Sequence, residues 1–395
     1  MSPIPLAAEW NTYRFDDMAF EVKDRVAVPR ESGFNRYVGL AHLDSGSLKI
    51  NRWGSTDEVE KQKILFKTGD IIFGRRNAYL RRVALADFDG VCSAHAMVLR
   101  AKSEVVLPDF LPFFMQTETF WQAALRNSAG SLSPTINWSN IKKEEFLLPP
   151  IEEQRRIAEM MQAVEKVSHT LLATNKAIQM AFSSVLYDAV SEKGNAYKYM
   201  KWVDKPLGEI ADITKLAGFE YTEHVKYKEG GEIIAIRPLN IKNGELVLDD
   251  IQTIDKATSD KLPRSKVHAG DILMTYIGLV GELILINEED RFHLAPNIAS
   301  IRSKGEIDPR LLEILLRGSH VQRQIKSLTT ATTLSSLTMG RLRSLSIRFP
   351  YQNDDQLRLY EDLDRLRSGS REIHERKFAI DKLKRSLLSN AFSYS

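Results

Sequence analysis

The stretch Ile151-Glu-Glu-Gln-Arg-Arg-Ile-Ala-Glu159 opens a run that contains no glycine or proline before Gly194. Acidic residues in the first turn, directly after Pro149 and Pro150, are typical of a helix start. A helix of roughly 40 residues extends about 60 Å, at about 1.5 Å per residue. Alternate steps of four and three along the run select mostly apolar side chains, which is the seam of a coiled coil. The apolar seam positions are Ile157, Met161, Val164, Leu171 and Ile178, and the polar breaks are Ser168 and Asn175.

A second run near the end of the chain has the same seam. Its apolar positions are Leu359, Leu363, Leu366, Ile373 and Ile380, with polar breaks at Ser370 and Lys377. Two matched apolar surfaces in one chain favour packing of the two helices on each other, and packing of each helix on its own globular block is the alternative. A pseudo-two-fold axis would make the pair antiparallel, with Ser168 near Lys377 and Asn175 near Ser370.

The rest of the chain also repeats, with a period of about 200 residues. Gly69-Asp70 returns as Gly270-Asp271, and Pro149 returns as Pro350. The segment Ser93-Ala-His-Ala-Met-Val-Leu-Arg-Ala-Lys102 is echoed by Ala295-Pro-Asn-Ile-Ala-Ser-Ile-Arg-Ser-Lys304. We interpret the repeat as an internal duplication that gives a pseudo-two-fold molecule, which suits a bipartite target.

Each globular block mixes short strand-like runs with helices, so we expect an α/β or α+β class. The glycine-bounded apolar runs 69–74 and 270–278 predict buried strands, and one helix is expected around 108–126 and one around 309–328. The predicted organisation is a globular domain over 1–149, a helical spacer over 150–195, a second globular domain over 196–349 and a second spacer over 350–395.

Composition sets wide bounds on function. Of 395 residues, 43% are hydrophobic and 27% charged, a balance typical of a globular protein. The single cysteine, Cys92, excludes a disulfide framework and a cysteine-rich zinc site and fits a reducing cytosol. No secretion signal and no long apolar run is visible, so we expect a cytoplasmic protein. The net charge of +3 means that nucleic-acid binding would have to come from local patches.

One such patch follows the first predicted buried strand, in Arg75-Arg76-Asn77-Ala-Tyr79-Leu-Arg81-Arg82. Arginine and asparagine can read guanine and adenine edges, and arginine also binds phosphate. A solvated strand end is the alternative. The equivalent place in the second block reads Thr275-Tyr276-Ile-Gly-Leu-Val-Gly281, without arginine. The framework repeats while the candidate reading residues differ, as two recognition modules with different targets would need.

Other polar residues at matched positions are weaker candidates for DNA contacts. His95 and Asn297 could touch nucleic acid, although a satisfied polar residue in the core is the favoured interpretation. Small polar loops offer hydroxyls suited to phosphate, and turn chemistry alone also explains them. The loop residues are Ser131, Asn137, Thr332 and Thr333, and nearby cations that either contact phosphate or solvate an edge are Lys142, Lys143, Arg341 and Arg343.

Common catalytic motifs are absent from the sequence. It contains no Gly-x-x-x-x-Gly-Lys-Ser/Thr loop, no His-Glu-x-x-His, no Cys-x-x-Cys and no Gly-x-Ser-x-Gly. The Asn/Asp-Pro-Pro-aromatic motif of adenine methyltransferases is also missing. We therefore expect a chain without catalytic or metal-binding residues, whose chemistry resides in partners.

The duplication, the string Leu148-Pro-Pro-Ile-Glu-Glu-Gln-Arg-Arg-Ile157 and the strand opening Gly69-Asp-Ile-Ile-Phe73 together resemble the specificity subunit of a Type I restriction-modification system. The resemblance spans essentially the whole chain. The second copy, Phe349-Pro-Tyr-Gln-Asn-Asp-Asp-Gln356, keeps the first proline and the glutamine but lacks the second proline.

This resemblance implies two target-recognition domains, each reading half of a split sequence in double-stranded DNA, joined by two antiparallel spacer helices. It further implies two methyltransferase subunits around those helices and restriction subunits in the larger assembly. S-adenosylmethionine, ATP and Mg²⁺ would be held by these partners, and no cofactor is expected in this chain. Two alternatives are a recognition subunit of a methylation or phage-defence complex without a restriction motor, and a coiled-coil scaffold that binds proteins.

Overall fold

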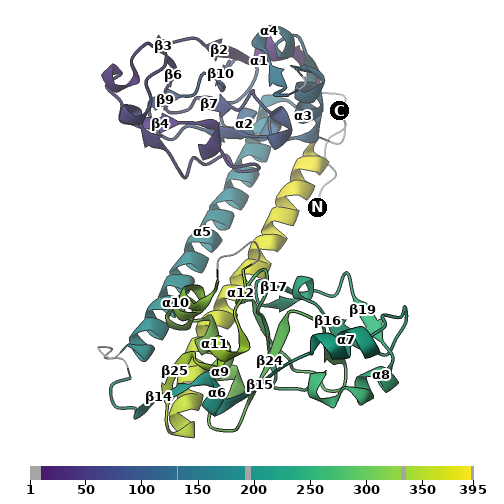
Figure 1. The fold of residues 1–395 in the computed structure, drawn as a ribbon. Coiled ribbons are helices and arrows are strands. Elements are labelled where there is room, and N and C mark those ends of the chain that lie inside the picture. The colour runs from purple at the N-terminus through teal and green to yellow at the C-terminus, as the bar shows by residue number, and fades with distance from the viewer. Residues whose placement is uncertain (1–9, 131, 192–196, 331–334, 393–395) are drawn as a thin grey trace. The chain divides into compact units, whose positions relative to one another are not determined.

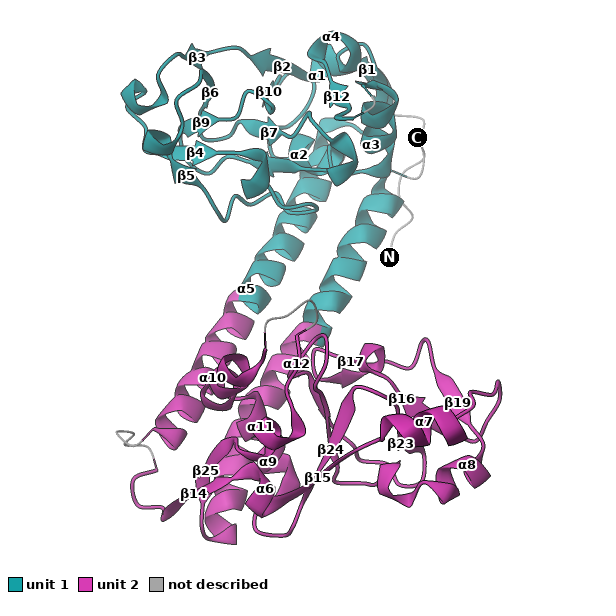
Figure 2. Ribbon diagram, in the orientation of Figure 1, with its two compact units in different colours: residues 1–172, 375–395 teal, residues 173–374 magenta. Residues whose placement is uncertain are grey.

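A computed structural model describes residues 10–130, 132–191, 197–330 and 335–392 (Figure 1). The chain forms two compact units, coloured separately in Figure 2. Unit 1 contains residues 1–172 and 375–395, and unit 2 contains residues 173–374. Two long helices, α5 (Ile151–Val190) and α12 (Asn353–Ala391), each contribute one half to each unit.

Unit 1 is built on two main sheets. A four-stranded antiparallel sheet has the order β2-β10-β7-β8, and a five-stranded sheet has the order β3-β6-β9-β4-β5, in which β4 and β9 are parallel. Its strands are β1 (Asn11–Arg14), β2 (Ala19–Val22), β3 (Arg25–Val26), β4 (Arg36–Val38), β5 (Gly54–Ser55), β6 (Lys63–Phe66), β7 (Ile71–Phe73), β8 (Val83–Leu85), β9 (Gly90–Cys92), β10 (Met97–Ala101), β11 (Ser128–Ala129), β12 (Thr135–Ile136) and β13 (Glu145–Leu148). Its shorter helices are α1 (Phe15–Met18), η2 (Pro29–Glu31), η3 (Leu40–His42), η4 (Thr56–Glu58), η5 (Ala78–Leu80), α2 (Leu111–Phe114), α3 (Glu118–Arg126) and α4 (Trp138–Ile141).

Two apolar clusters hold unit 1 together. The larger one packs aromatic rings from helices and strands, with ring centroids 5.1 Å apart for Phe114 and Phe146 and 5.4 Å apart for Phe15 and Phe120. Phe392, just after α12, reaches the same cluster, 5.6 Å from the ring of Phe114. The smaller cluster contains apolar residues of both main sheets. The end of α12 is therefore part of the core of the first globular domain.

Unit 2 repeats this plan. One four-stranded antiparallel sheet has the order β15-β24-β21-β22, and a second has the order β19-β16-β23-β20, in which β16 and β23 are parallel. Its strands are β14 (Trp202–Pro206), β15 (Ala211–Lys215), β16 (Ile233–Ile236), β17 (Ile241–Lys242), β18 (Glu245–Leu246), β19 (Gln252–Ile254), β20 (Lys266–Val267), β21 (Ile272–Thr275), β22 (Leu283–Leu285), β23 (Phe292–Leu294), β24 (Ile298–Ser303) and β25 (Ser346–Pro350). Its shorter helices are α6 (Leu207–Ile210), α7 (Gly218–His224), η6 (Pro238–Asn240), α8 (Lys256–Lys261), η7 (Pro263–Ser265), α9 (Pro309–Arg317), α10 (Ser319–Leu328) and α11 (Met339–Arg343).

The shared topology confirms the predicted duplication and the mixed α and β class. Where one helix was expected around 108–126, the structure has two, because the chain turns after α2 and Thr117 caps α3 by accepting from the backbone N–H of Phe120. The second expected helix also divides, at Gly318, where an added Cβ would lie 2.9 Å from Cδ2 of Leu186. The glycine permits the close approach of α5, so the prediction of a single helix in each block was wrong.

The repeated Gly-Asp pair makes the same turn in both units. Gly69 and Gly270 have φ values of 88° and 89°, a backbone conformation that glycine adopts without steric cost. The buried carboxylate of Asp70 accepts two hydrogen bonds from the guanidinium of Arg100, at 2.7 and 3.0 Å. Asp271 accepts the same pair from Arg302, at 2.6 and 2.8 Å. The pairing of a buried acid with arginine thus explains two of the repeated positions at once.

The repeated glutamine at each long helix start joins that helix to its globular domain. The Gln154 side chain accepts from the backbone N–H of Leu107 at 2.9 Å and donates to the carbonyls of Val105 and Pro149 at 3.1 and 3.0 Å. Gln356 accepts from Asp308 at 2.9 Å and donates to the carbonyls of Glu306 and Pro350 at 2.9 and 3.0 Å. The second proline, absent from the second copy, is not needed for this contact.

The long helices pair antiparallel within each unit, which confirms the predicted coiled coil. In unit 1, the Lys384 ammonium of α12 donates a hydrogen bond to the Glu165 carboxylate of α5, and Ile157 and Leu388 belong to the same buried apolar cluster. In unit 2, the Ser370 hydroxyl donates to Oδ1 of Asn175 at 2.6 Å, in the register that the polar breaks predict.

Each helix also packs on the adjacent globular domain. Leu359 and Leu363 of α12, for example, belong to the core of unit 2. The two packing alternatives for the seam are therefore combined rather than exclusive.

Candidate nucleic-acid interface

The arginine loop, residues 75–82, leaves the end of β7 and is held by two other segments. The backbone N–H of Ile136 donates to the carbonyl of Arg75 at 2.9 Å, and that of Asn77 donates to the carbonyl of Pro134 at 2.8 Å. A guanidinium N–H of Arg75 donates to the carbonyl of Ala94 at 3.1 Å. The structure thus brings the arginine loop together with the turn at His95 and the loop before Asn137, three segments that the sequence singled out separately.

The side chains of the arginine loop differ in how firmly they are held. Arg76 donates to the Ser133 hydroxyl at 3.1 Å, and Arg81 forms a two-point ion pair with Glu118, at 2.6 and 2.9 Å. The hydrogen bonds from Arg81 lower the pKa of Glu118. Tyr79 is 59% exposed. Arg75 and Arg76 are therefore presented from a fixed loop, while Arg81 already has an anionic partner.

The other candidates of the first unit lie on its surface. His95 is exposed, so the favoured interpretation of a core residue was wrong for it. Asn137 and Lys143 are exposed at α4, and Lys142 is half-buried. Arg82 is half-buried and bridges Ser45 through its backbone. Ser131 lies outside the described residues.

The matching loop of unit 2 has the same framework. The N–H of Leu337 donates to the carbonyl of Tyr276 at 2.9 Å, as Ile136 does to Arg75, and Gly278 donates to Ser335 at 2.9 Å. Gly278 and its counterpart Asn77 both have positive φ values, of 85° and 55°. Position by position, Arg75 is replaced by Tyr276 and Arg76 by Ile277. The two loops have the same pattern of backbone hydrogen bonds but carry different side chains.

Two predicted residues of this second loop face inward. Thr275 is buried, its hydroxyl donates to the carbonyl of Leu279 and accepts from the N–H of Glu282, and it therefore holds the loop rather than facing solvent. Tyr276 is largely buried, and burial raises the pKa of its phenol. Sequence reasoning missed Leu279, which is 77% exposed at the loop tip, and Lys215, whose ammonium lies 5.5 Å from the Tyr276 ring centre. The contact of Lys215 has no local sequence signal because β15 brings it there.

The remaining candidates of unit 2 lie at its other loops. Asn297 is half-buried with a φ of 72°, and its carbonyl accepts from the N–H of Tyr276. Arg341 and Arg343 are exposed at α11, where they donate to the carbonyls of Leu328 and Ile213 at 2.9 and 2.8 Å. Thr332 and Thr333 lie outside the described residues.

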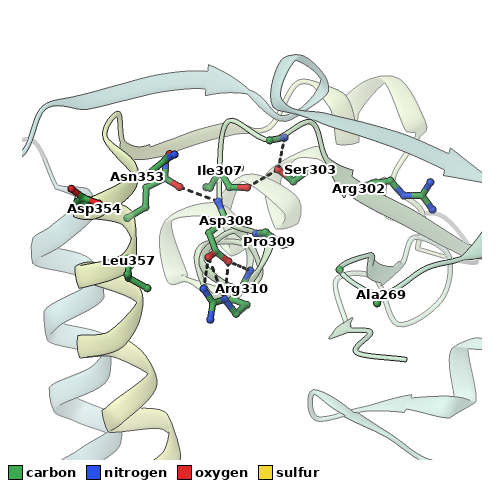
Figure 3. A pocket seen from close by; sticks show the side chains of 13 residues that line it. Ala269, Arg302, Ser303, Ile307, Asp308, Pro309, Arg310, Asn353, Asp354 and Leu357 are labelled. Atoms are coloured by element: carbon green, nitrogen blue, oxygen red, sulfur yellow. Dashed lines mark hydrogen bonds and ion pairs between the residues drawn. The ribbon is translucent and has the colours of Figure 1, made fainter. Parts of the chain in front are cut away.

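A cavity of about 520 Å³ lies where α12 leaves the second globular domain (Figure 3). Figure 3 shows the side chains of Asp308 and Arg310 turned toward each other at the start of α9, with Asn353 and Asp354 at the start of α12. Two arginines and two aspartates line it, so it does not offer the single sign of charge that a nucleic-acid site needs.

Among the described ranges, no group of three or more His, Cys, Asp or Glu side chains is placed to hold a metal ion. None of the helices in those ranges combines the length and apolarity needed to span a bilayer. The Cys92 thiol is buried, which raises its pKa and makes it a poor nucleophile.

A family model described as the Type I restriction modification DNA specificity domain matches the chain twice, over residues 8–179 and 199–380. The two matches cover most of the sequence and coincide with the two copies of the repeat. The chain belongs to this family.

Curated relatives carry names consistent with this membership. The chain is 27% identical over 164 residues to the Type I restriction enzyme EcoDI specificity subunit of Escherichia coli, a match covering 41% of the chain and 36% of that protein. It is 25% identical over 312 residues to the EcoBI specificity subunit of the same organism, covering 71% of the chain and 64% of that protein. The matched regions thus span about a third and just under two thirds of these two relatives.

Solved structures share the fold. The Type I restriction-modification S subunit from M. genitalium superposes with a TM-score of 0.63 at 15% identity, covering 97% of this chain and 96% of that one. A chain from a structural study of Type I complex assembly and conformational transition superposes with a TM-score of 0.58 at 19% identity, covering 99% of both chains. At this level of identity the similarity establishes the architecture of two globular domains and paired long helices.

Proposed function

We propose that this chain is the DNA sequence-specificity subunit of a Type I restriction-modification complex and reads a split target. The observation that carries the proposal is the pair of matched loops. Both follow an inner strand of a duplicated sheet and are held by the same backbone hydrogen bonds, yet one carries Arg75 and Arg76 where the other carries the buried Tyr276 and the half-buried Ile277. A shared scaffold with different side chains is what two recognition modules for different half-sites require.

In this proposal phosphate contacts position each domain, and side chains of the matched loops read base edges. The first domain would use the arginine loop, where Arg75 and Arg76 approach guanine or phosphate. The second would rely more on the exposed, apolar Leu279, together with the cations Arg341 and Arg343. DNA binding should weaken with salt in proportion to the number of phosphate contacts.

The paired helices would serve as the spacer and as the platform for partners. α5 has 40 residues, which corresponds to about 60 Å at about 1.5 Å per residue, against about 34 Å for one DNA turn. Exposed apolar side chains on both helices, among them Met180, Tyr187 and Phe378, offer contacts for other subunits. We infer a non-catalytic cytoplasmic subunit that binds two methyltransferase subunits and restriction subunits, which hold S-adenosylmethionine, ATP and Mg²⁺.

The test is co-expression with the neighbouring methyltransferase subunit, followed by mapping of methylated adenines across genomic DNA. A split motif with a fixed spacer is expected. Replacement of residues 1–149 by the corresponding domain of another specificity subunit should change one half of the motif and leave the other half intact. Absence of both complex formation and methylation would refute the assignment.

A recognition subunit of a methylation complex without a restriction motor would present the same surfaces. Co-purification decides between the two, because a restriction subunit should be recovered with the complex only in the first case. A protein-binding scaffold is the outcome if the methyltransferase complex forms but binds no duplex DNA.

A further inference from the structure

A cavity of about 360 Å³ lies in unit 2 along β15 and β24, and three arginines line it. Arg302 comes from β24, Arg264 from η7 and Arg343 from the end of α11. The hydroxyls of Thr214 and Ser300 belong to residues directly opposite each other on the two strands. This combination of guanidinium groups and hydroxyls around one cavity, called here the β15–β24 cavity, is an arrangement suited to an anion with several oxygens.

The hydroxyls of the cavity are not used by the protein. Ser300 is only 3% exposed and lines the cavity. Across the part of the chain that the structure describes, neither the Ser300 nor the Thr214 side chain forms a hydrogen bond. A ligand that accepts from these hydroxyls would therefore displace no hydrogen bond within the protein.

The arginines are held in place by the fold. Two donors on one edge of the Arg302 guanidinium are bonded to Asp271, which leaves its other donors open. Arg343 donates to the carbonyl of Ile213 at 2.8 Å, and its stem crosses Gly208, where an added Cβ would lie 2.9 Å from Cβ of Arg343. Gly208 therefore makes room for Arg343 at the cavity. Positioned guanidinium groups lose little conformational freedom when an anion binds.

The charge of the cavity lining is positive. Arg264 is exposed and has no ion pair among the described residues. The one acid in the lining, Asp212, is exposed, and its carboxylate lies 3.7 Å from the Lys304 ammonium. The negative charge of Asp212 is thus partly compensated by Lys304, which does not line the cavity. The three arginines therefore leave the lining with a net positive charge.

The first copy of the repeat lacks this arrangement. In the same strand register, Val98 stands opposite Val22, where Ser300 stands opposite Thr214 in unit 2, and both valines are buried in the apolar cluster between the sheets. Phe20, opposite Arg100, takes the place of Asp212, opposite Arg302. The duplicated scaffold therefore folds with an apolar pair at this position, and the hydroxyls of unit 2 are not required by the sheet.

The short helix beside the cavity, α6, also differs from its counterpart in the first copy, α1. The backbone carbonyl of Asp16 accepts a hydrogen bond from the Lys102 ammonium at 2.6 Å. The carbonyl of Gly208 accepts the same bond from the Lys304 ammonium at 3.0 Å, so Asp16 is the counterpart of Gly208. The first copy thus carries an acid where the second has the glycine that accommodates Arg343. Both differences favour the binding of an anion in unit 2 and not in unit 1.

We propose that the β15–β24 cavity binds a phosphate group. Resting on the proposed function, we further assign that group to the DNA backbone contacted by the second recognition domain, with free phosphate as the other source. A phosphate takes hydrogen bonds from several directions, which fits the guanidinium and hydroxyl donors that line the cavity. Such a contact would position the second domain without reading sequence, and it would make the two half-sites unequal in their dependence on salt.

Two sets of variants test the proposal in the full chain co-expressed with the methyltransferase subunit. T214V/S300V reproduces the Val22 and Val98 pair of the first copy and so should fold. R264Q/R343Q changes only exposed cavity residues. R323Q, on α10 outside the cavity, is the control for a lost surface charge, and thermal unfolding of each complex checks its folding.

The first measurement is the affinity of the complex for a duplex that carries its methylation motif, as a function of salt concentration. The slope of log K against log salt should become shallower by about 0.9 for each lost phosphate contact in R264Q/R343Q and remain unchanged in R323Q. T214V/S300V should weaken binding several-fold and equally for all sequences of the second half-site. Both results would support a backbone phosphate in the cavity.

The second measurement is a calorimetric titration of the full chain with inorganic phosphate. Binding that is lost in both variant sets, while their DNA affinity stays unchanged, would retain the phosphate site and overturn its assignment to DNA. Unchanged salt slopes together with no phosphate binding would overturn the proposal. A wild-type complex that binds no DNA would refute the proposed function, and the phosphate titration would still decide whether the cavity is a phosphate site.

Discussion

At the scale of single residues, the backbone decides which arginines of unit 1 are available. Asn77 and Arg81 have positive φ values, of 55° and 49°, and enclose the short helix η5 between them. This conformation turns Arg81 onto Glu118 and leaves Arg75 and Arg76 against the neighbouring loops. The arginines of the loop are indistinguishable in the sequence, but the structure separates Arg81, which has a structural ion pair, from Arg75 and Arg76, which are candidate DNA contacts.

Substitution of Arg76 by alanine should weaken DNA binding at one half-site only, by roughly 1 to 3 kcal/mol if a bidentate base contact is lost. The measurement is the affinity of the methyltransferase complex for duplexes altered in either half of the target. Arg30→Ala, an exposed arginine of the same unit outside the loop, is the control. An equal loss on every duplex would instead identify Arg76 as a phosphate contact.

The sequence predicted positions better than it predicted side-chain roles. The arginine loop, the turn at His95 and the loop before Asn137 were each recognised, and the fold brings them together. Their burial was not predictable, since His95 and its counterpart Asn297 follow the same pattern but differ in exposure. Thr275 resembles a surface polar residue in sequence and is buried because the loop folds back over it. Tertiary hydrogen bonds decide such cases, and they leave no local pattern.

At the scale of elements, the long helices were predictable from periodicity and the glutamine contact was not. The glutamine could be recognised as part of a family string, but two of its three hydrogen bonds reach a loop roughly 50 residues away in the chain. The breaks that divide the predicted helices arise in the same way, from a capping threonine and from a close approach at Gly318. Local pattern specifies a helix, and packing partners specify its ends.

The two glutamines should contribute similarly to stability. Gln154→Ala and Gln356→Ala each leave two carbonyls and one N–H without their partner, so each should lower the free energy of unfolding by roughly 1 to 3 kcal/mol. Denaturant unfolding of the full chain measures the effect, and Gln179→Ala, exposed on α5, is the matched control. A loss for Gln154→Ala alone would show that the second copy, without its second proline, is held by other contacts.

At the scale of the whole molecule, the duplication supplies the two similar units that the proposed reading of a split target requires. The order of the first four-stranded sheet, the parallel strand pair of the second sheet, the Gly-Asp turn and the glutamine contact are the same in both units. The differences that bear on the proposed function lie in the matched loops and in the β15–β24 cavity. Selection for a new half-site can thus change one unit's surface while the other unit and both helices remain intact.

The boundary between the units crosses both long helices, at residues 172–173 of α5 and 374–375 of α12, and this permits a test of the spacer role. Insertion of seven residues at both places preserves the seam, because an apolar seam repeats every seven residues. Each helix would lengthen by about 10 Å at about 1.5 Å per residue, close to the rise of three base pairs. The complex should then methylate a motif with the same two halves and a spacer longer by about three base pairs. Insertion into one helix only should disrupt the pairing and abolish methylation, and an unchanged spacer after the double insertion would show that the helices do not set the distance between half-sites.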